Sequence, residues 1–170
     1  MGSTSAGLKH FARIQNYISW FEIPVYDIHR ASAFYNAIYG FEMEVRLSGE
    51  FAMAFFPAES GVGGALIAGP GCVPSDVGPL IYLNAGKQMD EILGRVELAG
   101  GRVIMGRTLI SPTAGHFALF IDSEGNRLAL HEEAVAPAKA AKSASTVKAV
   151  KAAPKTPAKK SAAKKATKKR

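Results

Sequence analysis

The sequence predicts an α+β protein in which one unit, a strand followed by a helix and three strands, occurs twice and precedes a basic tail. Two observations indicate this. Strand and helix patterns recur in the same order at a spacing of about 63 residues, with Trp20 and Leu83 as reference points. The composition changes abruptly after Glu133. We therefore expect an N-terminal extension (1–16), one domain (17–133) with modules at about 17–69 and 79–133, and a tail (134–170).

The first module begins with a strand and continues with a helix. Residues 17–25, YISWFEIPV, are rich in β-branched and aromatic residues, and they place Trp20 and Glu22 on the same face. Asp27 suits the N-cap of the helix, and Gly40 suits its end. The apolar stripe of this helix consists of Ile28, Ala31, Phe34, Tyr35 and Ile38. Three shorter strands are expected at 41–47, 51–57 and 63–69.

The second module repeats this order after a linker, residues 69–79, that is rich in glycine and proline. A strand at 80–85 leads into a helix that Gly100 and Gly101 end. The apolar stripe of that helix consists of Met89, Ile92, Leu93 and Val96. The remaining strands are expected at 102–106, 116–122 and 126–132, with a loop around 111–115.

Charge is divided sharply between the domain and the tail. All 14 acidic residues and nine basic ones precede residue 134, which gives the domain a net charge of −5. The tail holds eleven lysines and Arg170, with no acidic or aromatic residue. This composition predicts disorder, and it resembles the tails of linker histones and of some bacterial nucleic-acid-binding proteins. We expect non-specific binding of nucleic acid or another polyanion, while a purely solubilising tail, or one that contacts the acidic domain, remains an alternative.

The compartment is indicated by three absences in the sequence. Cys72 is the only cysteine, so that no intramolecular disulfide can form. The N-terminus lacks the apolar run of a signal peptide, and no segment approaches the roughly 20 apolar residues of a membrane span. The sequence therefore predicts a cytoplasmic protein without membrane contact.

Three short motifs occur in an order known from one protein superfamily. They are D-x-x-x-A-x-x-FY at Asp27–Tyr35, AGGRV at 99–103 and D-x-x-GN at 122–126. Together with the repeated unit they resemble the vicinal oxygen chelate superfamily, which includes glyoxalase I, bleomycin-resistance proteins and extradiol dioxygenases. The resemblance covers about residues 17–133. It implies two βαβββ modules whose eight strands form a cupped mixed sheet around a small-molecule site, and a homodimer, since members often pair.

The resemblance also implies where a divalent metal would bind. In the metal-dependent members, the first and last strands of each module supply one ligand each. The corresponding positions here are Trp20, residues 63–69, Leu80 and Ala129, and none of them offers a carboxylate, imidazole or thiolate. Divalent ions need such donors. We therefore expect no metal cofactor at the usual position.

Two ionisable side chains lie near these positions, and their role is left open. Glu22 is two residues from Trp20, and His131 is two residues from Ala129. One possibility is an acid/base pair in a lyase or isomerase, and a second is a hydrogen-bonded pair at the rim of the site. A third is that both side chains bind a relocated metal in a dioxygenase-type enzyme, with Asn84 or Tyr82 as a weak third ligand.

The remaining candidates concern ligand binding. Trp20, Tyr82 and Phe120 are candidates for the aromatic walls of a pocket, with core packing as the alternative for each. Asn84 is a candidate for a hydrogen bond to the ligand, with the end of a strand as the alternative. The sequence thus favours a glyoxalase-like protein that binds a small organic molecule without a metal. The alternatives are an enzyme that uses Glu22 and His131, and a nucleic-acid-associated scaffold that acts through its tail.

Overall fold

The computed structural model describes residues 16–135, which contain two copies of the repeated unit. The first module consists of β1 (Trp20–Pro24), α1 (Ile28–Tyr39), β2 (Glu44–Ser48), β3 (Phe51–Phe55) and β4 (Gly63–Ala68). The second consists of β5 (Tyr82–Asn84), α2 (Met89–Val96), β6 (Arg102–Ser111), β7 (Gly115–Ile121) and β8 (Arg127–Glu132). The predicted α+β class and βαβββ order are confirmed. The expectations for the extension and the tail lie outside the described residues, apart from Asn16, Ala134 and Val135.

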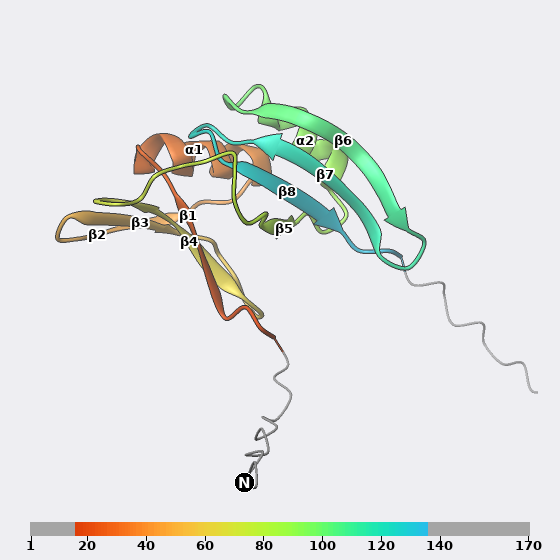
Figure 1. Ribbon diagram of the computed structural model, residues 1–170, viewed down its shortest axis with the longest axis horizontal. Helices are drawn as coiled ribbons and strands as arrows, with labels where there is room; N and C mark the ends of the chain where they lie inside the picture. The colour runs from red at the N-terminus through yellow and green to blue at the C-terminus, as the bar shows by residue number, and fades with distance from the viewer. Residues whose placement is uncertain (1–15, 136–170) are drawn as a thin grey trace, which may run out of the picture. The chain divides into compact units, whose positions relative to one another are not determined.

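Each module forms its own mixed sheet of four strands. Figure 1 shows the strands of the two modules as two separate groups. The hydrogen-bonded order is β1-β4-β3-β2 in the first sheet and β5-β8-β7-β6 in the second. In both sheets the first strand of the module pairs in parallel with the last, and the other neighbours are antiparallel. The eight strands are therefore divided between two sheets, because each module's first strand is paired within its own module.

The helix α1 is formed as its sequence predicts. The Oδ1 atom of Asp27 accepts hydrogen bonds from the backbone N–H groups of His29 and Arg30, at 2.9 and 3.0 Å. Gly40 ends the helix in the left-handed conformation, with φ at 76°. The whole predicted apolar stripe is buried. Neither α1, with 12 residues, nor α2, with 8, is long and apolar enough to cross a bilayer, and no other helix lies in residues 16–135.

The hydrophobic core lies between the helices and one face of each sheet, and α1 belongs to the core of both modules. The ring of Phe34, from α1, stacks on that of Phe120, from β7, with 6.3 Å between centroids. The two helices also pack against each other, and Arg95 of α2 donates a hydrogen bond to the carbonyl of Ile38 in α1. The two modules therefore share one core, as expected for a repeated unit.

The strand β6 is longer than the sequence predicts. The expected strand ended at residue 106, whereas β6 pairs with β7 as far as Ser111, with three irregularities of register on the way. Nearly all its side chains from Arg102 to Ile110 are exposed. The alternation of apolar and polar residues that marks a half-buried strand is therefore missing, and only the pairing with β7 defines the element.

Candidate functional site

An aromatic pair lies on the face of the first sheet that is turned away from α1. The rings of Trp20 and Phe55 are 6.1 Å apart between centroids and inclined by 52°. The Nε1–H of Trp20 donates a hydrogen bond of 3.2 Å to the carboxylate of Glu22. Gly63 is the register partner of Trp20, and a Cβ there would lie 3.1 Å from the indole. The missing side chain thus lets the indole lie close to β4, with 44% of Trp20 still exposed.

Charged groups flank this aromatic pair. The guanidinium of Arg46 lies 5.0 Å from the centroid of the Phe55 ring, within the range of a cation–π contact. It also donates two hydrogen bonds, of 2.8 and 2.7 Å, to the carboxylate of Glu44, and these lower the pKa of that carboxyl. We call this surface the Trp20 face, and we define it by Trp20, Glu22, Arg46 and Phe55. Arg46 and Phe55 were not predicted as site residues, although strand alternation places both on this face.

A second open surface, the Tyr82 face, belongs to the second sheet. It consists of Tyr82, Asn84, Ala129 and His131, because the parallel register places Tyr82 beside Ala129 and Asn84 beside His131. Tyr82 is 52% exposed, whereas Ala129 is fully buried by its neighbours without belonging to the shared core. Four residues that the sequence singled out thus lie on one face.

The polar groups of the Tyr82 face have partners in their own module. The Nε2 atom of His131 lies 2.8 Å from the carbonyl oxygen of Ala114, which can only accept, so Nε2 carries a hydrogen and donates it. The side-chain oxygen of Asn84 accepts a hydrogen bond of 2.8 Å from the backbone N–H of Gly86. His131 is therefore fixed by a loop carbonyl, and Asn84 caps the turn after β5.

The structure does not bring all the predicted site residues together. In residues 16–135 no hydrogen bond or ion pair joins Glu22 to His131; the former accepts from Trp20 and the latter donates to Ala114. Phe120 lies on the helix side of the second sheet, where it is completely buried against Phe34. Phe120 is thus a core residue, and its assignment to a pocket wall is corrected.

The side chains at the metal-ligand positions that the resemblance implies do not suit a divalent ion. Trp20 and Ala129 occupy two of the expected ligand positions and offer no donor atom. In the part of the chain that the structure describes, no three His, Cys, Asp or Glu side chains gather closely enough to hold an ion. Zinc commonly takes at least three protein ligands, so we derive no step through a metal.

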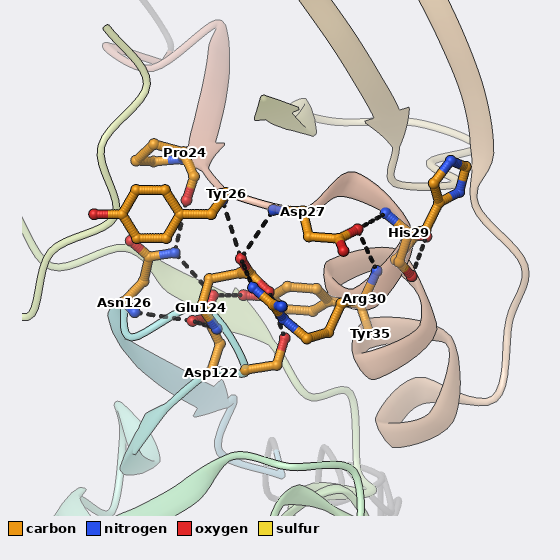
Figure 2. Close-up of polar contacts among 11 residues, drawn as sticks. Pro24, Tyr26, Asp27, His29, Arg30, Tyr35, Asp122, Glu124 and Asn126 are labelled. Carbon is orange, nitrogen blue, oxygen red and sulfur yellow. Dashed lines mark hydrogen bonds and ion pairs between the residues drawn. The ribbon is translucent and has the colours of Figure 1, made fainter. Parts of the chain in front are cut away.

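The turn between β7 and β8 carries a buried polar network, shown in Figure 2. The carboxylate of Asp122 accepts hydrogen bonds from the backbone N–H groups of Glu124 and Asn126 and, at 2.8 Å, from the hydroxyl of Tyr35 in α1. The side-chain amide of Asn126 donates to Asp122 and to the carbonyl of Pro24, at 2.9 and 2.8 Å. This turn of the second module is thus bound to β1 and α1 of the first.

Glu124 makes most of these hydrogen bonds between the modules (Figure 2). Its Oε2 atom accepts the backbone N–H groups of Tyr26 and Asp27, at 3.0 and 3.1 Å, and both carboxylate oxygens accept from Arg30, at 2.7 and 2.8 Å. The Glu124 side chain is completely buried, whereas that of Arg30 is 54% exposed. The D-x-x-GN motif located this turn in the sequence, but it assigned Glu124 no role.

The comparisons with known proteins agree with this architecture. Residues 18–54 match the family model described as bleomycin resistance protein-like N-terminal. This match covers β1, α1 and β2 and ends within β3. No curated protein sequence matches the chain.

Solved structures extend the likeness to both modules. A glyoxalase/bleomycin resistance protein from Albidiferax ferrireducens T118 is 16% identical with a TM-score of 0.53, over 69% of this chain and 100% of that one. A glyoxylase/bleomycin resistance protein/dioxygenase domain from Frankia sp. EAN1pec is 14% identical with a TM-score of 0.55, over 69% and 98%. At sequence identities this low, the structural similarity establishes the fold alone. The expected glyoxalase/bleomycin resistance/dioxygenase fold is therefore confirmed.

Proposed function

We propose that this protein binds a small organic molecule on its Trp20 face and that it does so without a metal. The observation that carries the proposal is the pair of the exposed Trp20 and the half-buried Phe55, flanked by Arg46 and Glu22. Aromatic rings with a few placed polar groups are typical of small-molecule sites. The pair is available to stack on a planar group, while the guanidinium and the carboxylate select polar substituents.

We propose further that the site is completed in a homodimer. Large apolar side chains are exposed on both open faces and along the edge strand β6, among them Trp20, Tyr82, Leu109 and Ile110. Extended exposed apolar surface of this kind marks interaction sites. A second copy would cover it and bring a Tyr82 face opposite a Trp20 face, which gives the ligand two walls.

The test uses Trp20 as an intrinsic reporter, because it is the only tryptophan of the chain. A panel of aromatic compounds is titrated while Trp20 emission is recorded, with light scattering on the same samples to check for twice the 18.0 kDa chain mass. For a compound that binds, Phe55→Ala is expected to raise Kd about three- to tenfold, the value of an aromatic contact. The control Leu47→Ala, at an exposed side chain on the other face of β2, leaves Kd unchanged. If Phe55→Ala binds the compound with the same Kd as the wild type, the Trp20 face is not the binding site.

Proton transfer by Glu22 and His131 has no specific support in the contacts of these residues. A catalytic pair needs its two groups within reach of one substrate atom. Here Glu22 is bound to Trp20, and His131 is held by the Ala114 carbonyl. We therefore propose a binding protein rather than a lyase or an isomerase.

The basic tail carries a second proposed activity, non-specific binding of polyanions. Its twelve positive charges without aromatic residues suit phosphate contacts but not base stacking. If six to ten phosphates are contacted, affinity for duplex DNA falls by about 10³- to 10⁵-fold between 50 and 200 mM salt. Deletion of residues 134–170 is expected to abolish DNA binding and to leave binding on the Trp20 face intact. A salt-independent affinity argues against the proposal.

A further inference from the structure

A pocket of about 790 Å³ lies between the two modules, apart from the Trp20 face. One wall consists of aromatic residues at the edge of the shared core, and the other is residues 79–84, the chain that enters and forms β5. The loop between β3 and β4 closes one side. Pockets that bury a small ligand commonly have volumes of about 300 to 1,000 Å³, so this one has a suitable size.

The aromatic wall is a chain of rings in contact. Phe56 is 5.6 Å from Phe21 and 6.1 Å from Phe41, and Phe41 stacks on Tyr39 with 5.2 Å between centroids and an angle of 14°. All four residues are half-buried and pack against the core, so their positions are fixed by the fold. A wall of this kind presents ring faces and edges that favour another flat ring.

The pocket contains no charged side chain among the described residues that line it. Its polar side chains are those of Tyr39, Ser60, Tyr82 and Asn84. An ion moved from water into such a lining loses hydration and gains no counter-charge. The lining therefore selects a neutral molecule.

The hydroxyl of Tyr39 is unsatisfied. It is buried, and within residues 16–135 no group is placed to form a hydrogen bond with it. Burial also raises the pKa of Tyr39, so its hydroxyl stays protonated at neutral pH and remains a donor. A buried donor without an acceptor costs free energy. Because the hydroxyl itself is buried, a ligand in the pocket meets the ring of Tyr39 and not its hydroxyl.

We propose that this pocket binds a neutral, planar aromatic molecule that packs against its wall of aromatic rings. The proposal goes beyond the Trp20 face, because it concerns a separate set of residues. Tyr82 and Asn84, which the sequence singled out as ligand-binding residues, line this pocket as well as the second open face.

The test titrates the full chain with prodan, a neutral naphthalene that carries a ketone, and records the emission of the dye. The anionic 8-anilinonaphthalene-1-sulfonate serves as the charged comparison. We expect prodan to bind with about one equivalent per chain and the sulfonate at least about tenfold more weakly.

A matched pair of variants locates the binding. Val62→Trp places an indole in the lining and is expected to abolish binding of prodan, whereas Val77→Trp, at an exposed residue outside the lining, leaves it unchanged. Loss of prodan binding in Phe55→Ala but not in Val62→Trp would overturn the proposal, since the dye would then occupy the Trp20 face. Binding that appears only after removal of residues 1–15 would overturn it too, since the chain itself would then fill the pocket.

Discussion

Replacing Glu124 with alanine is expected to lower the free energy of unfolding by about 2 to 4 kcal/mol. The substitution leaves the backbone N–H groups of Tyr26 and Asp27 without an acceptor and removes the paired hydrogen bonds from Arg30. Each of these part-buried donors costs about 1 to 2 kcal/mol when it is left without an acceptor, while the exposed guanidinium can return to water. Urea denaturation followed by Trp20 fluorescence measures the change. A loss below about 0.5 kcal/mol would contradict the role of Glu124 as the link between the modules.

The contribution of Glu124 is also expected to depend on pH. Burial by itself raises the pKa of Glu124, but the hydrogen bonds from Arg30, Asp27 and Tyr26 outweigh it and hold the pKa below its ordinary value of 4.5. A carboxyl with a depressed pKa stabilises the fold fully above its unfolded pKa, and this stabilisation is lost as pH falls through the folded pKa. Wild type is therefore expected to lose stability relative to Glu124→Gln below a pH of about 4.5.

The glutamine variant is the matched control for this experiment. Its amide oxygen can still accept the backbone N–H groups of Tyr26 and Asp27, whereas its charge and its pairing with Arg30 are lost. Other carboxylates titrate equally in both proteins, so the difference in unfolding free energy isolates residue 124. A difference that stays constant between pH 7 and pH 3 would show that the charge of Glu124 contributes nothing.

Gly115→Ala is expected to destabilise the fold by about 3 to 5 kcal/mol, a fall in Tm of at least about 10 °C. Gly115 begins β7 with φ at 86°, a conformation that alanine adopts only with strain. A Cβ at this position would also collide with the carbonyl oxygen of Glu132 and approach the backbone N of Ala134 to 2.6 Å. These are backbone atoms at the end of β8, so relief requires a shift of the strand itself.

Gly61→Ala separates the two causes. Gly61 has nearly the same φ, 88°, but nothing lies within 4 Å of the Cβ that alanine would add. Its cost is therefore the backbone strain alone, about 1 to 3 kcal/mol. Thermal unfolding of both variants, followed by circular dichroism, is expected to give a Tm for Gly115→Ala that is well below the Tm of Gly61→Ala. Equal Tm values would mean that the contact of the added Cβ with the end of β8 does not contribute to the loss of stability.

Local signals in the sequence were sufficient for the repeated unit and for α1. The side chain of Asp27 caps the helix, Gly40 ends it, and the spacing of the apolar residues identifies the buried stripe, since each signal acts within one or two turns. The strand β6 was only partly recognised. Its exposed side chains follow no periodic pattern, and its length is set by pairing with β7.

Phe120 is an example of a residue whose burial strand alternation alone could not predict. In β7, GHFALFI, apolar residues occur on both faces, with Phe117 and Leu119 on one and Ala118 and Phe120 on the other. The pattern therefore shows which residues share a face but not which face meets a helix. The packing of Phe34 on Phe120 decides this, and it removes Phe120 from the candidate site.

The sequence by itself determined the two βαβββ modules, the residues that share a face of each regular strand, and the absence of donors at Trp20 and Ala129, because these depend on residue type and local spacing. Only the tertiary structure decided that Glu22 and His131 have separate partners, that Glu124 joins the modules, and that Tyr39 lines a neutral pocket. Such contacts join residues far apart in the chain, and the shared core sets their distances. No local pattern encodes how two modules pack against each other.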